Sequence, residues 1–339
     1  MSEIKPFTGV DDRVRLADSV PVDTPFTLNV FPSEVCNFRC CYCAQSLGKE
    51  KLREEYGLQG QMMSIETMEL AVRQSKEFPH RYKLVSFMGH GEPLCNKRLP
   101  DMIYCVKNGG IADRIDIITN ASLLTPEFSD RLLEAGLDVL RVSLQGINSE
   151  SYRNTCGVNI DFQRFYENLA YFYKASRATG CKLYVKTMDV SLKDGETDRF
   201  YELFGGISDR MYIDKVKPVY DKVSYTEEQN DISVDRYGNR HERRIVCPQP
   251  FYMLSLWPDG DVAPCDALYK ANPLGNIYDT SLAKMWLNKN HKDFCVCHLS
   301  GGRFFHEKCS RCCAPDDVAH KEDILDGDRE KLLQIFKTK

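Results

Sequence analysis

Residues 26–43 read FTLNVFPSEVCNFRCCYC, an apolar strand pattern that runs directly into a loop with four cysteines in eight residues. The gaps of three and two residues between Cys36, Cys40 and Cys43 allow three thiolates of one loop to converge on a single metal cluster, whose fourth corner then has no protein ligand. A structural zinc site would instead be closed by four ligands. Cys41 is the sequence-local candidate for that fourth ligand, but adjacent side chains on a tight loop diverge.

Strand and helix patterns alternate from this stretch onward. Strand patterns lie at residues 26–31, 83–88, 114–119, 138–144, 182–190 and 211–219. Helical patterns between them lie at residues 65–78, 99–106, 126–135, 162–178 and 198–204. This alternation predicts parallel pairing, and six units in about 190 residues fall short of the roughly 250 of a complete eight-unit barrel. We therefore expect an α/β fold, a partial, open (β/α)6 barrel with its active-site loops at the carboxyl ends of the strands.

The composition of the 339-residue chain restricts its functional class. With 45 Lys and Arg against 49 Asp and Glu, the formal net charge is −4, so we expect no nucleic-acid partner. No apolar run is long enough for a membrane span, and the first residues lack a signal-peptide pattern, which predicts a cytoplasmic protein without a membrane partner. Fifteen cysteines, an odd number, indicate metal-binding thiols and not a disulfide framework.

Changes in composition predict the domain organisation. We expect residues 1–24 to form an N-terminal surface arm and residues 25–225 to form the partial barrel. Residues 226–339 begin with a polar linker, become rich in proline, glycine and cysteine, and are predicted to form a small metal-supported domain. A charged insertion at residues 48–61, GKEKLREEYGLQGQ, is expected to be a mobile loop beside the first cysteines.

A second set of cysteines lies in this C-terminal region. Cys247 and Cys265 flank a PDGD turn that contains Gly260, which predicts a hairpin with one thiol at each end. Cys309 and Cys312 form the other pair of the set. Four thiolates in two pairs fit one closed, fully protein-ligated site, for which an iron–sulfur cluster and zinc are both candidates.

The first cysteine loop resembles the signature of the radical S-adenosylmethionine (radical SAM) enzymes. That signature is C-x3-C-x2-C with an aromatic residue before the last cysteine, a position that Tyr42 fills here. The resemblance implies that Cys36, Cys40 and Cys43 hold a [4Fe-4S] cluster, whose open iron binds the amine and carboxylate of S-adenosylmethionine.

Three later segments resemble cofactor-binding segments of the same family. MGHGEP at residues 88–93 is similar to the family's GGEP turn, with His90 in place of the first glycine. TNA at residues 119–121 is similar to its TNG turn, and VSLQG at residues 142–146 resembles the segment that precedes a cofactor-binding arginine. The resemblance implies that the cofactor-binding residues are Tyr42, Gly91, Glu92, Pro93, Asn120, Ser143 and Arg153.

The second cysteine set resembles the SPASM/Twitch extension of many radical SAM enzymes. The segments LGNI and SLAKMW, at residues 274–277 and 281–286, are also typical of it. A full SPASM domain continues after Cys312 with C-x5-C-x3-C, which is absent here, so the resemblance implies the shorter Twitch form with one auxiliary [4Fe-4S] cluster. Cys295 and Cys297 are left over and would alter that count if they were ligands.

The resemblance implies that the protein reductively cleaves S-adenosylmethionine to a 5′-deoxyadenosyl radical, which abstracts hydrogen from a substrate. We expect a small hydroxylated substrate, similar to a sugar or an aminocyclitol, because 24 residues before the barrel are too few for a leader-binding domain. Modification of a ribosomally made peptide, by epimerisation or cross-linking, is the alternative. A non-catalytic iron–sulfur or zinc binding module is a third hypothesis. A reducing electron donor such as flavodoxin or ferredoxin is implied as a partner.

Two fates of the substrate radical remain open. The auxiliary cluster can accept the electron, which gives net oxidation, or a cysteine thiol can return a hydrogen, which gives epimerisation. Cys156, Cys295 and Cys297 are the candidate donors, because Cys156 follows the Arg153 segment and the other two lie in the small domain. We favour oxidation, since four paired cysteines indicate a cluster more strongly than any free thiol indicates a hydrogen donor.

Overall fold

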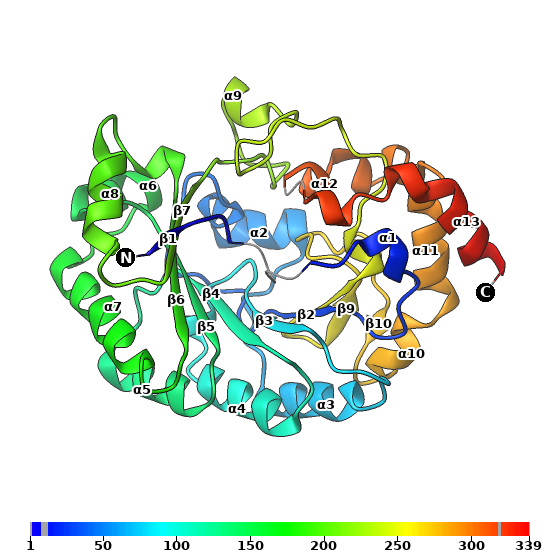
Figure 1. Ribbon diagram of the computed structural model, residues 1–339, viewed down its shortest axis with the longest axis horizontal. Coiled ribbons are helices and arrows are strands. Elements are labelled where there is room, and N and C mark those ends of the chain that lie inside the picture. Colours follow the sequence, from blue (N-terminus) through cyan, green and yellow to red (C-terminus); the bar gives the residue numbers. More distant parts are fainter. Residues whose placement is uncertain (1, 8–12, 318–319, 339) are drawn as a thin grey trace.

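One curved sheet forms the frame of the protein (Figure 1). The computed structural model describes residues 2–7, 13–317 and 320–338. Within that part of the chain the sheet has ten strands, in the order β1-β7-β6-β5-β4-β3-β2-β8-β9-β10. Six of these are the strands expected from the sequence: β2 Thr27–Val30, β3 Leu84–Phe87, β4 Ile115–Thr119, β5 Val139–Leu144, β6 Lys182–Met188 and β7 Arg210–Asp214. All six pair in parallel, which confirms the open α/β barrel.

Helices cover the convex side of this arc (Figure 1). They are α3 Ile65–Ser75, α4 Leu99–Gly109, α5 Pro126–Glu134, α6 Ser149–Cys156, α7 Phe162–Ser176 and α8 Glu196–Phe204. Polar residues fix several helix starts; the Thr125 side chain, for example, accepts a hydrogen bond from the Phe128 N–H. Apolar side chains of the strands and helices share one core, which leaves the concave side of the sheet free for polar residues.

The side chains of each strand alternate between these two faces. On β5, Val142 and Leu144 are fully buried in the core, whereas Arg141 and Ser143 are partly exposed on the concave side. The register places Ser143 opposite Lys186 of β6. The parallel strands therefore carry a row of polar groups across the inside of the barrel.

The charged insertion at residues 48–61 contradicts the expectation of a mobile loop. Gly48–Tyr56 forms helix α2, which ends at Gly57 in the left-handed conformation (φ 74°). Lys, Glu, Leu and Arg favour a helix intrinsically, and Leu52 packs against Ala44, Leu58 and Leu268. The expectation was wrong because the density of charge hid these two buried leucines, Leu52 and Leu58.

The C-terminal region continues the barrel sheet. Strand β8 (Met253–Leu256) pairs in parallel with β2, and then pairs antiparallel with β9 (Asp261–Ala263). Gly260 lies between them with φ 88°, as the predicted hairpin requires. The remaining elements are strand β10 Gly275–Asn276 and helices α9 Glu227–Asn230, α10 Leu282–Trp286, α11 Lys289–Leu299, α12 Ala314–Asp317 and α13 Arg329–Thr338.

The N-terminal segment reaches both ends of the arc (Figure 1). Strand β1 (Glu3–Ile4) pairs with β7, and helix α1 (Leu16–Ser19) packs into a second apolar cluster with side chains of the C-terminal helices. Residues 8–12 of the expected arm lie outside the described residues. The short 3₁₀ helices are Ala44–Leu47, Pro93–Cys95, Asp189–Ser191, Gln249–Phe251, Gly302–Phe304, Cys309–Arg311, Lys321–Asp323 and Asp326–Asp328.

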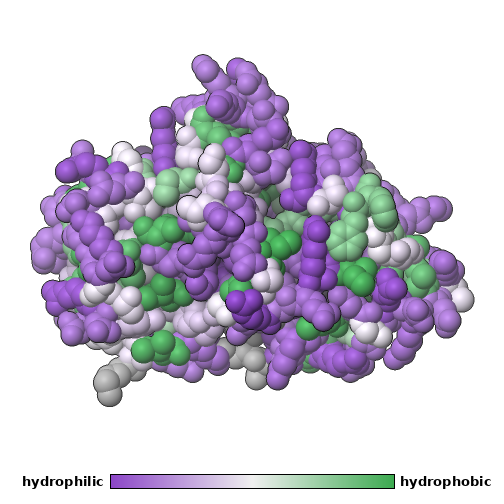
Figure 2. Space-filling model, turned by 90° about the horizontal axis from the view of Figure 1, so that it is seen from above, coloured by the Kyte–Doolittle hydropathy of each residue, from purple (hydrophilic) through white to green (hydrophobic). Residues whose placement is uncertain are grey.

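Polar side chains dominate the surface that faces upward in Figure 1. Seen from above, this surface is mainly hydrophilic, and its hydrophobic residues form separate patches (Figure 2). Among the described residues, the helices are all too short or too polar to cross a bilayer.

Candidate active site and cluster-binding cysteines

The first cysteine loop follows β2 and is anchored to helix α6. The Arg39 N–H donates to the Cys156 carbonyl at 3.1 Å, and the Cys41 N–H donates to the Thr155 carbonyl at 2.9 Å. Within the loop, the Cys43 N–H donates to the Cys40 carbonyl at 2.9 Å. These backbone bonds fix the shape of the loop independently of any bound group.

The three predicted ligand thiols of this loop lie close enough to interact electrostatically. Burial raises the pKa of Cys36 to about 12 and also raises that of Cys43, and the charges of Glu92, Cys43 and Cys95 add to the effect at Cys36. A hydrogen bond with Cys156 is the main cause of the raised pKa of Cys40. Cys41 is exposed, as expected for a residue outside the set. Bound iron would reverse these shifts, since coordination deprotonates thiols.

The carboxylate of Glu92 joins the turn after β3 to the end of β4. It is 3% exposed and accepts hydrogen bonds from the Leu94 N–H at 2.9 Å, the Asn120 N–H at 2.8 Å and the Thr119 hydroxyl. Burial raises its pKa, and these donors oppose the increase. Glu92 therefore holds two loops together, and its oxygens are already engaged within the protein.

Two further contacts hold the cysteine loop from the neighbouring strands. The Asn120 side chain after β4 donates to Asn37, which lies between Cys36 and Cys40, at 3.0 Å. The Tyr42 hydroxyl donates to the side chain of Gln145, which directly follows β5. The structure therefore brings the predicted residues Tyr42, Glu92 and Asn120 together around one loop.

The backbone of these turns is closely packed. A Cβ atom on Gly91 would lie 2.2 Å from the Ser33 carbonyl oxygen, so only glycine fits there. Pro93 is buried at the start of a 3₁₀ helix. Ala121, in the position of the family's glycine, adopts φ 57°, a left-handed conformation that is unfavourable for a residue with a side chain.

The other two predicted cofactor contacts lie on β5 and α6. Ser143 faces the inside of the barrel on β5, opposite Lys186. Arg153 is exposed on α6, where its Nε donates to the Asn159 side chain at 2.8 Å. Ser143 and Arg153 therefore remain predicted contacts of S-adenosylmethionine.

His90 has a role that sequence reasoning missed. Its Nε2 lies 2.7 Å from the carbonyl oxygen of Asp266, and its Nδ1 lies 3.3 Å from the Tyr220 hydroxyl. Burial lowers its pKa, which favours the neutral ring. Because Asp266 directly follows Cys265, His90 connects the turn after β3 to the second cysteine set. The only sequence signal was its departure from the GGEP pattern.

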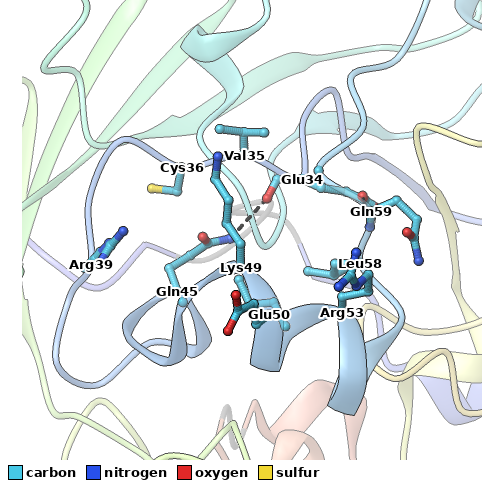
Figure 3. Close-up of a pocket in the computed structure, with 13 residues that line it drawn as sticks. Glu34, Val35, Cys36, Arg39, Gln45, Lys49, Glu50, Arg53, Leu58 and Gln59 are labelled. Carbon is cyan, nitrogen blue, oxygen red and sulfur yellow. Dashed lines mark hydrogen bonds between the residues drawn. The ribbon is translucent and has the colours of Figure 1, made fainter.

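A pocket of about 440 Å³ lies between the cysteine loop and α2 (Figure 3). Gln45 lies at its wall, where its side chain donates to the carbonyl oxygens of Glu34, at 3.1 Å, and His90. Cys36 borders the same pocket, together with the basic side chains Arg39, Lys49 and Arg53. Of the first cysteine set, Cys36 is therefore reached from this pocket.

The second cysteine set lines one small cavity. Cys247, Cys265, Cys309 and Cys312 all border it, and burial raises the pKa of each thiol, that of Cys309 to about 12. Among the described residues, no three histidine, cysteine or carboxylate side chains converge tightly enough for a single metal ion.

Polar groups around this cavity fit a larger thiolate-bound group. His298 borders the cavity, and both of its ring nitrogens are buried without a hydrogen-bond partner among the described residues. The Tyr269 hydroxyl faces the Cys312 thiol. Four thiols with unpartnered polar groups at their side match the needs of an iron–sulfur cluster, whose sulfurs accept hydrogen bonds.

A third cavity, of about 340 Å³ and larger than the cysteine-lined one, lies between the inside of the barrel and the second cysteine set. Its barrel side includes Ser86, Arg141 and Lys186, and its other side includes Tyr269 and Cys312. Tyr269 and Cys312 also border the small cysteine-lined cavity, so they form a wall that the two cavities share.

The three candidate hydrogen-donor thiols do not border this larger cavity. Cys156 is buried on α6, where its thiol contacts Cys40 and the Tyr152 carbonyl. Cys295 is buried beside His291 in the C-terminal apolar cluster, and Cys297 is half-buried on the same helix. Of the described cysteines, only Cys312 is among the residues that line the larger cavity.

Two known protein families match the parts of the chain that contain the two cysteine sets. The sequence model of the radical SAM superfamily matches residues 30–199, half of the chain, which include the first cysteine loop. The chain belongs to the radical SAM superfamily. The SPASM iron-sulfur cluster-binding domain matches residues 247–313, which include all four cysteines of the second set. This radical SAM protein is therefore a member of an enzyme family that uses a [4Fe-4S] cluster, S-adenosylmethionine and an auxiliary cluster.

Individual relatives match only part of the chain or have low sequence identity to it. A "Probable GTP 3',8-cyclase" of Methanococcus maripaludis is 37% identical over 137 residues, which are 40% of this chain and 41% of that protein. The chain thus spans about two fifths of the length of this curated relative. The crystal structure of BtrN with AdoMet and 2-DOIA has a TM-score of 0.51 at 18% identity and covers 85% of this chain and 91% of its own. SuiB of Streptococcus suis bound to precursor peptide SuiA has a TM-score of 0.57 at 15% identity and covers 89% and 73%. Both structures show a shared fold.

Proposed function

We propose that this radical SAM enzyme oxidises a small hydroxylated molecule held in the 340 Å³ cavity. The observation that carries the proposal is the shared wall, because Tyr269 and Cys312 border both that cavity and the second cysteine set. A substrate in the cavity would then lie between the barrel and the auxiliary cluster. The volume is within the usual range of small-molecule sites, about 300–1,000 Å³.

The charges along the cavity support an uncharged or weakly charged substrate. Arg141 pairs with Asp116 at 3.1 Å, and Lys186 pairs with Asp214 at 2.6 Å. The guanidinium of Arg236 also pairs with a carboxylate, that of Asp317. Because each cation already has its own carboxylate, the cavity offers hydrogen bonds and not a large net charge.

Further polar atoms remain for binding hydroxyl groups. The Nε of Arg141 is buried and has no hydrogen-bond partner among the described residues. Tyr237, Tyr252 and Gln249 add polar side chains to the lining. A substrate with several hydroxyl groups matches this mixture of donors and acceptors, as in a sugar or an aminocyclitol.

The proposed reaction removes two hydrogens from one carbinol group. S-adenosylmethionine and the first cluster supply a 5′-deoxyadenosyl radical when bound, and the substrate gives that radical the hydrogen atom of its C–H bond. The hydroxyl proton would then pass to solvent or a base, and the auxiliary cluster, held by Cys247, Cys265, Cys309 and Cys312, would supply the acceptor for the remaining electron. A ketone results, and the chain's own residues orient the carbinol and exclude water.

The position of the free thiols supports oxidation over epimerisation. Cys156, Cys295 and Cys297 do not border the cavity, so none is placed to return a hydrogen to the substrate. Deuterium oxide separates the two outcomes, because an exchanged thiol would leave deuterium on the product carbon. A product two mass units lighter and free of deuterium would support oxidation.

A panel of deuterated compounds tests the substrate class. Reduced enzyme and S-adenosylmethionine are incubated with carbon-deuterated sugars and aminocyclitols, and 5′-deoxyadenosine is analysed by mass spectrometry. Deuterium in 5′-deoxyadenosine with a hydroxylated compound supports the proposal. Deuterium transfer from a deuterated peptide pool alone would contradict the proposal and support peptide modification. That alternative is suggested by the structural similarity to SuiB bound to its precursor peptide.

We further propose that the pocket in Figure 3 receives the electron donor. Three basic side chains, Arg39, Lys49 and Arg53, border it against two carboxylates, those of Glu34 and Glu50, and the Glu34 carboxylate is engaged by the backbone N–H groups of Gln59 and Gln61. An excess of basic side chains suits a flavodoxin or ferredoxin with an acidic surface. Lys49→Glu with Arg53→Glu should slow reduction by flavodoxin at low salt and leave reduction by dithionite unchanged. Equal rates with flavodoxin would contradict this docking site.

A further inference from the structure

His298 is the most isolated buried polar group beside the second cysteine set. It lies in the last turn of α11, is 1% exposed and borders the cavity that Cys247, Cys265, Cys309 and Cys312 line. Neither Nδ1 nor Nε2 has a hydrogen-bond partner among the described residues. Buried polar side chains nearly always have a partner, so an unpartnered histidine here indicates a group that the protein atoms do not supply.

A second histidine on the same helix provides a direct comparison. His291 lies two turns earlier and is also buried. Its Nδ1 lies 2.5 Å from the Trp286 carbonyl oxygen and its Nε2 lies 2.8 Å from the Pro250 carbonyl oxygen. The fold can therefore satisfy a histidine on this helix, and it leaves unsatisfied the one that borders the cysteine-lined cavity.

The ring of His298 is held in place by its neighbours. Phe294 packs against it edge-to-face, with ring centroids 4.6 Å apart. Arg303 borders the same cavity, but its guanidinium is engaged by Asp316 and by the carbonyl oxygens of Arg244 and Cys312. The ring therefore keeps its position without a hydrogen bond to protein, and its free N–H is available to a bound group.

We propose that His298 donates an N–H hydrogen bond to a sulfur of the auxiliary cluster and raises the cluster's reduction potential. A neutral imidazole has one N–H donor, and cluster sulfurs accept such bonds. Reduction adds negative charge to the cluster, so a donor stabilises the reduced state more than the oxidised state. His298 is a positioning residue in this proposal, because it acts on the cluster and does not touch substrate. The proposal is independent of which molecule the larger cavity binds.

The first test measures the reduction potential of the auxiliary cluster. Full-length protein with Cys36, Cys40 and Cys43 all changed to Ala retains only this cluster, so EPR-monitored redox titration reports on it alone. We expect His298→Phe to disfavour reduction about tenfold, a shift of about 59 mV to lower potential for one electron. His298→Gln, which keeps an N–H donor, should recover part of the shift.

His291→Phe is the matched control, since it makes the same change to a buried histidine of the same helix. It removes the N–H hydrogen bond that the ring donates to a backbone carbonyl, so it should lower stability and change the reduction equilibrium less than twofold. An equal shift in both variants would show a general packing effect and overturn the proposal. An unchanged potential in His298→Phe would also overturn it.

If His298→Phe fails to retain its cluster, pulsed EPR on protein that keeps His298 tests the hydrogen bond directly. With ¹⁵N-labelled histidine, a hydrogen bond gives a weak nitrogen coupling to the reduced auxiliary cluster. His298→Gln should abolish that coupling. A strong coupling typical of direct iron ligation, or no coupling at all, would each contradict the hydrogen bond.

Discussion

At the scale of single residues, the motif side chains around the first cysteine loop mainly bind one another. Glu92 accepts three hydrogen bonds within the protein, and Asn120 donates to Asn37 inside the cysteine loop. The residue types were predictable from the sequence, because the turns after three successive strands meet at one end of the barrel. Their mutual contacts were not predictable, because they depend on side-chain geometry across elements that lie far apart in the chain.

Ala121 provides a test of backbone strain at one residue. Its φ of 57° costs an L-residue roughly 1–2 kcal/mol, and glycine would remove most of this cost. Ala121→Gly should therefore raise the free energy of unfolding by about 0.5–1 kcal/mol, seen as an increase of about 1–2 °C in the anaerobic melting temperature. Ala135→Gly, at a right-handed position after α5, should have the opposite sign. A lower melting temperature for Ala121→Gly would contradict the strain.

Arg153 tests the predicted contact with S-adenosylmethionine. It is exposed, its Nε donates to Asn159 and its charge acts on Glu150, so its loss should leave the fold intact. If its guanidinium pairs with the methionyl carboxylate, Arg153→Ala should weaken cofactor binding about tenfold in equilibrium dialysis, with iron content unchanged. Arg164→Ala, an exposed change on α7, is the control. Wild-type affinity in Arg153→Ala would remove this residue from the site.

At the scale of elements, periodicity predicted what local sequence controls. The six barrel strands and the hairpin at Gly260 have clear patterns, and the structure confirms them. Helix α2 was missed because its charged face conceals one buried leucine, Leu52. The pairing of β1 with β7 was missed because two residues carry no pattern of their own.

His90 connects two elements and provides a test of that connection. Its ring bridges Asp266, beside Cys265, and Tyr220, so His90→Ala should remove buried hydrogen bonds worth about 1–3 kcal/mol. Hydrogen exchange should increase at residues 259–270, measured by mass spectrometry on the holoenzyme. His80→Ala, an exposed change, should leave that exchange at the wild-type rate. Unaltered exchange in His90→Ala would show that the bridge does not hold the hairpin.

At the scale of the whole molecule, one continuous sheet joins the two iron–sulfur regions. Strand β2, which leads into the first cysteine loop, pairs with β8 of the C-terminal hairpin, so the two cysteine sets are fixed relative to one another by backbone hydrogen bonds. The larger cavity lies between the inside of the barrel and the second cysteine set. The sequence indicated two cysteine sets, but not that β8 extends the barrel sheet, because strand order depends on tertiary packing.

The iron content tests the central claim, that the two cysteine sets hold two separate four-iron clusters. Anaerobically reconstituted wild-type protein should contain about eight irons per chain, with Mössbauer spectra of two [4Fe-4S] clusters. A variant with Cys36, Cys40 and Cys43 changed to Ala should contain about four, and one with Cys247, Cys265, Cys309 and Cys312 changed to Ala should also contain about four. Wild-type protein with about four irons and one zinc, and zinc lost only in the second variant, would contradict the account.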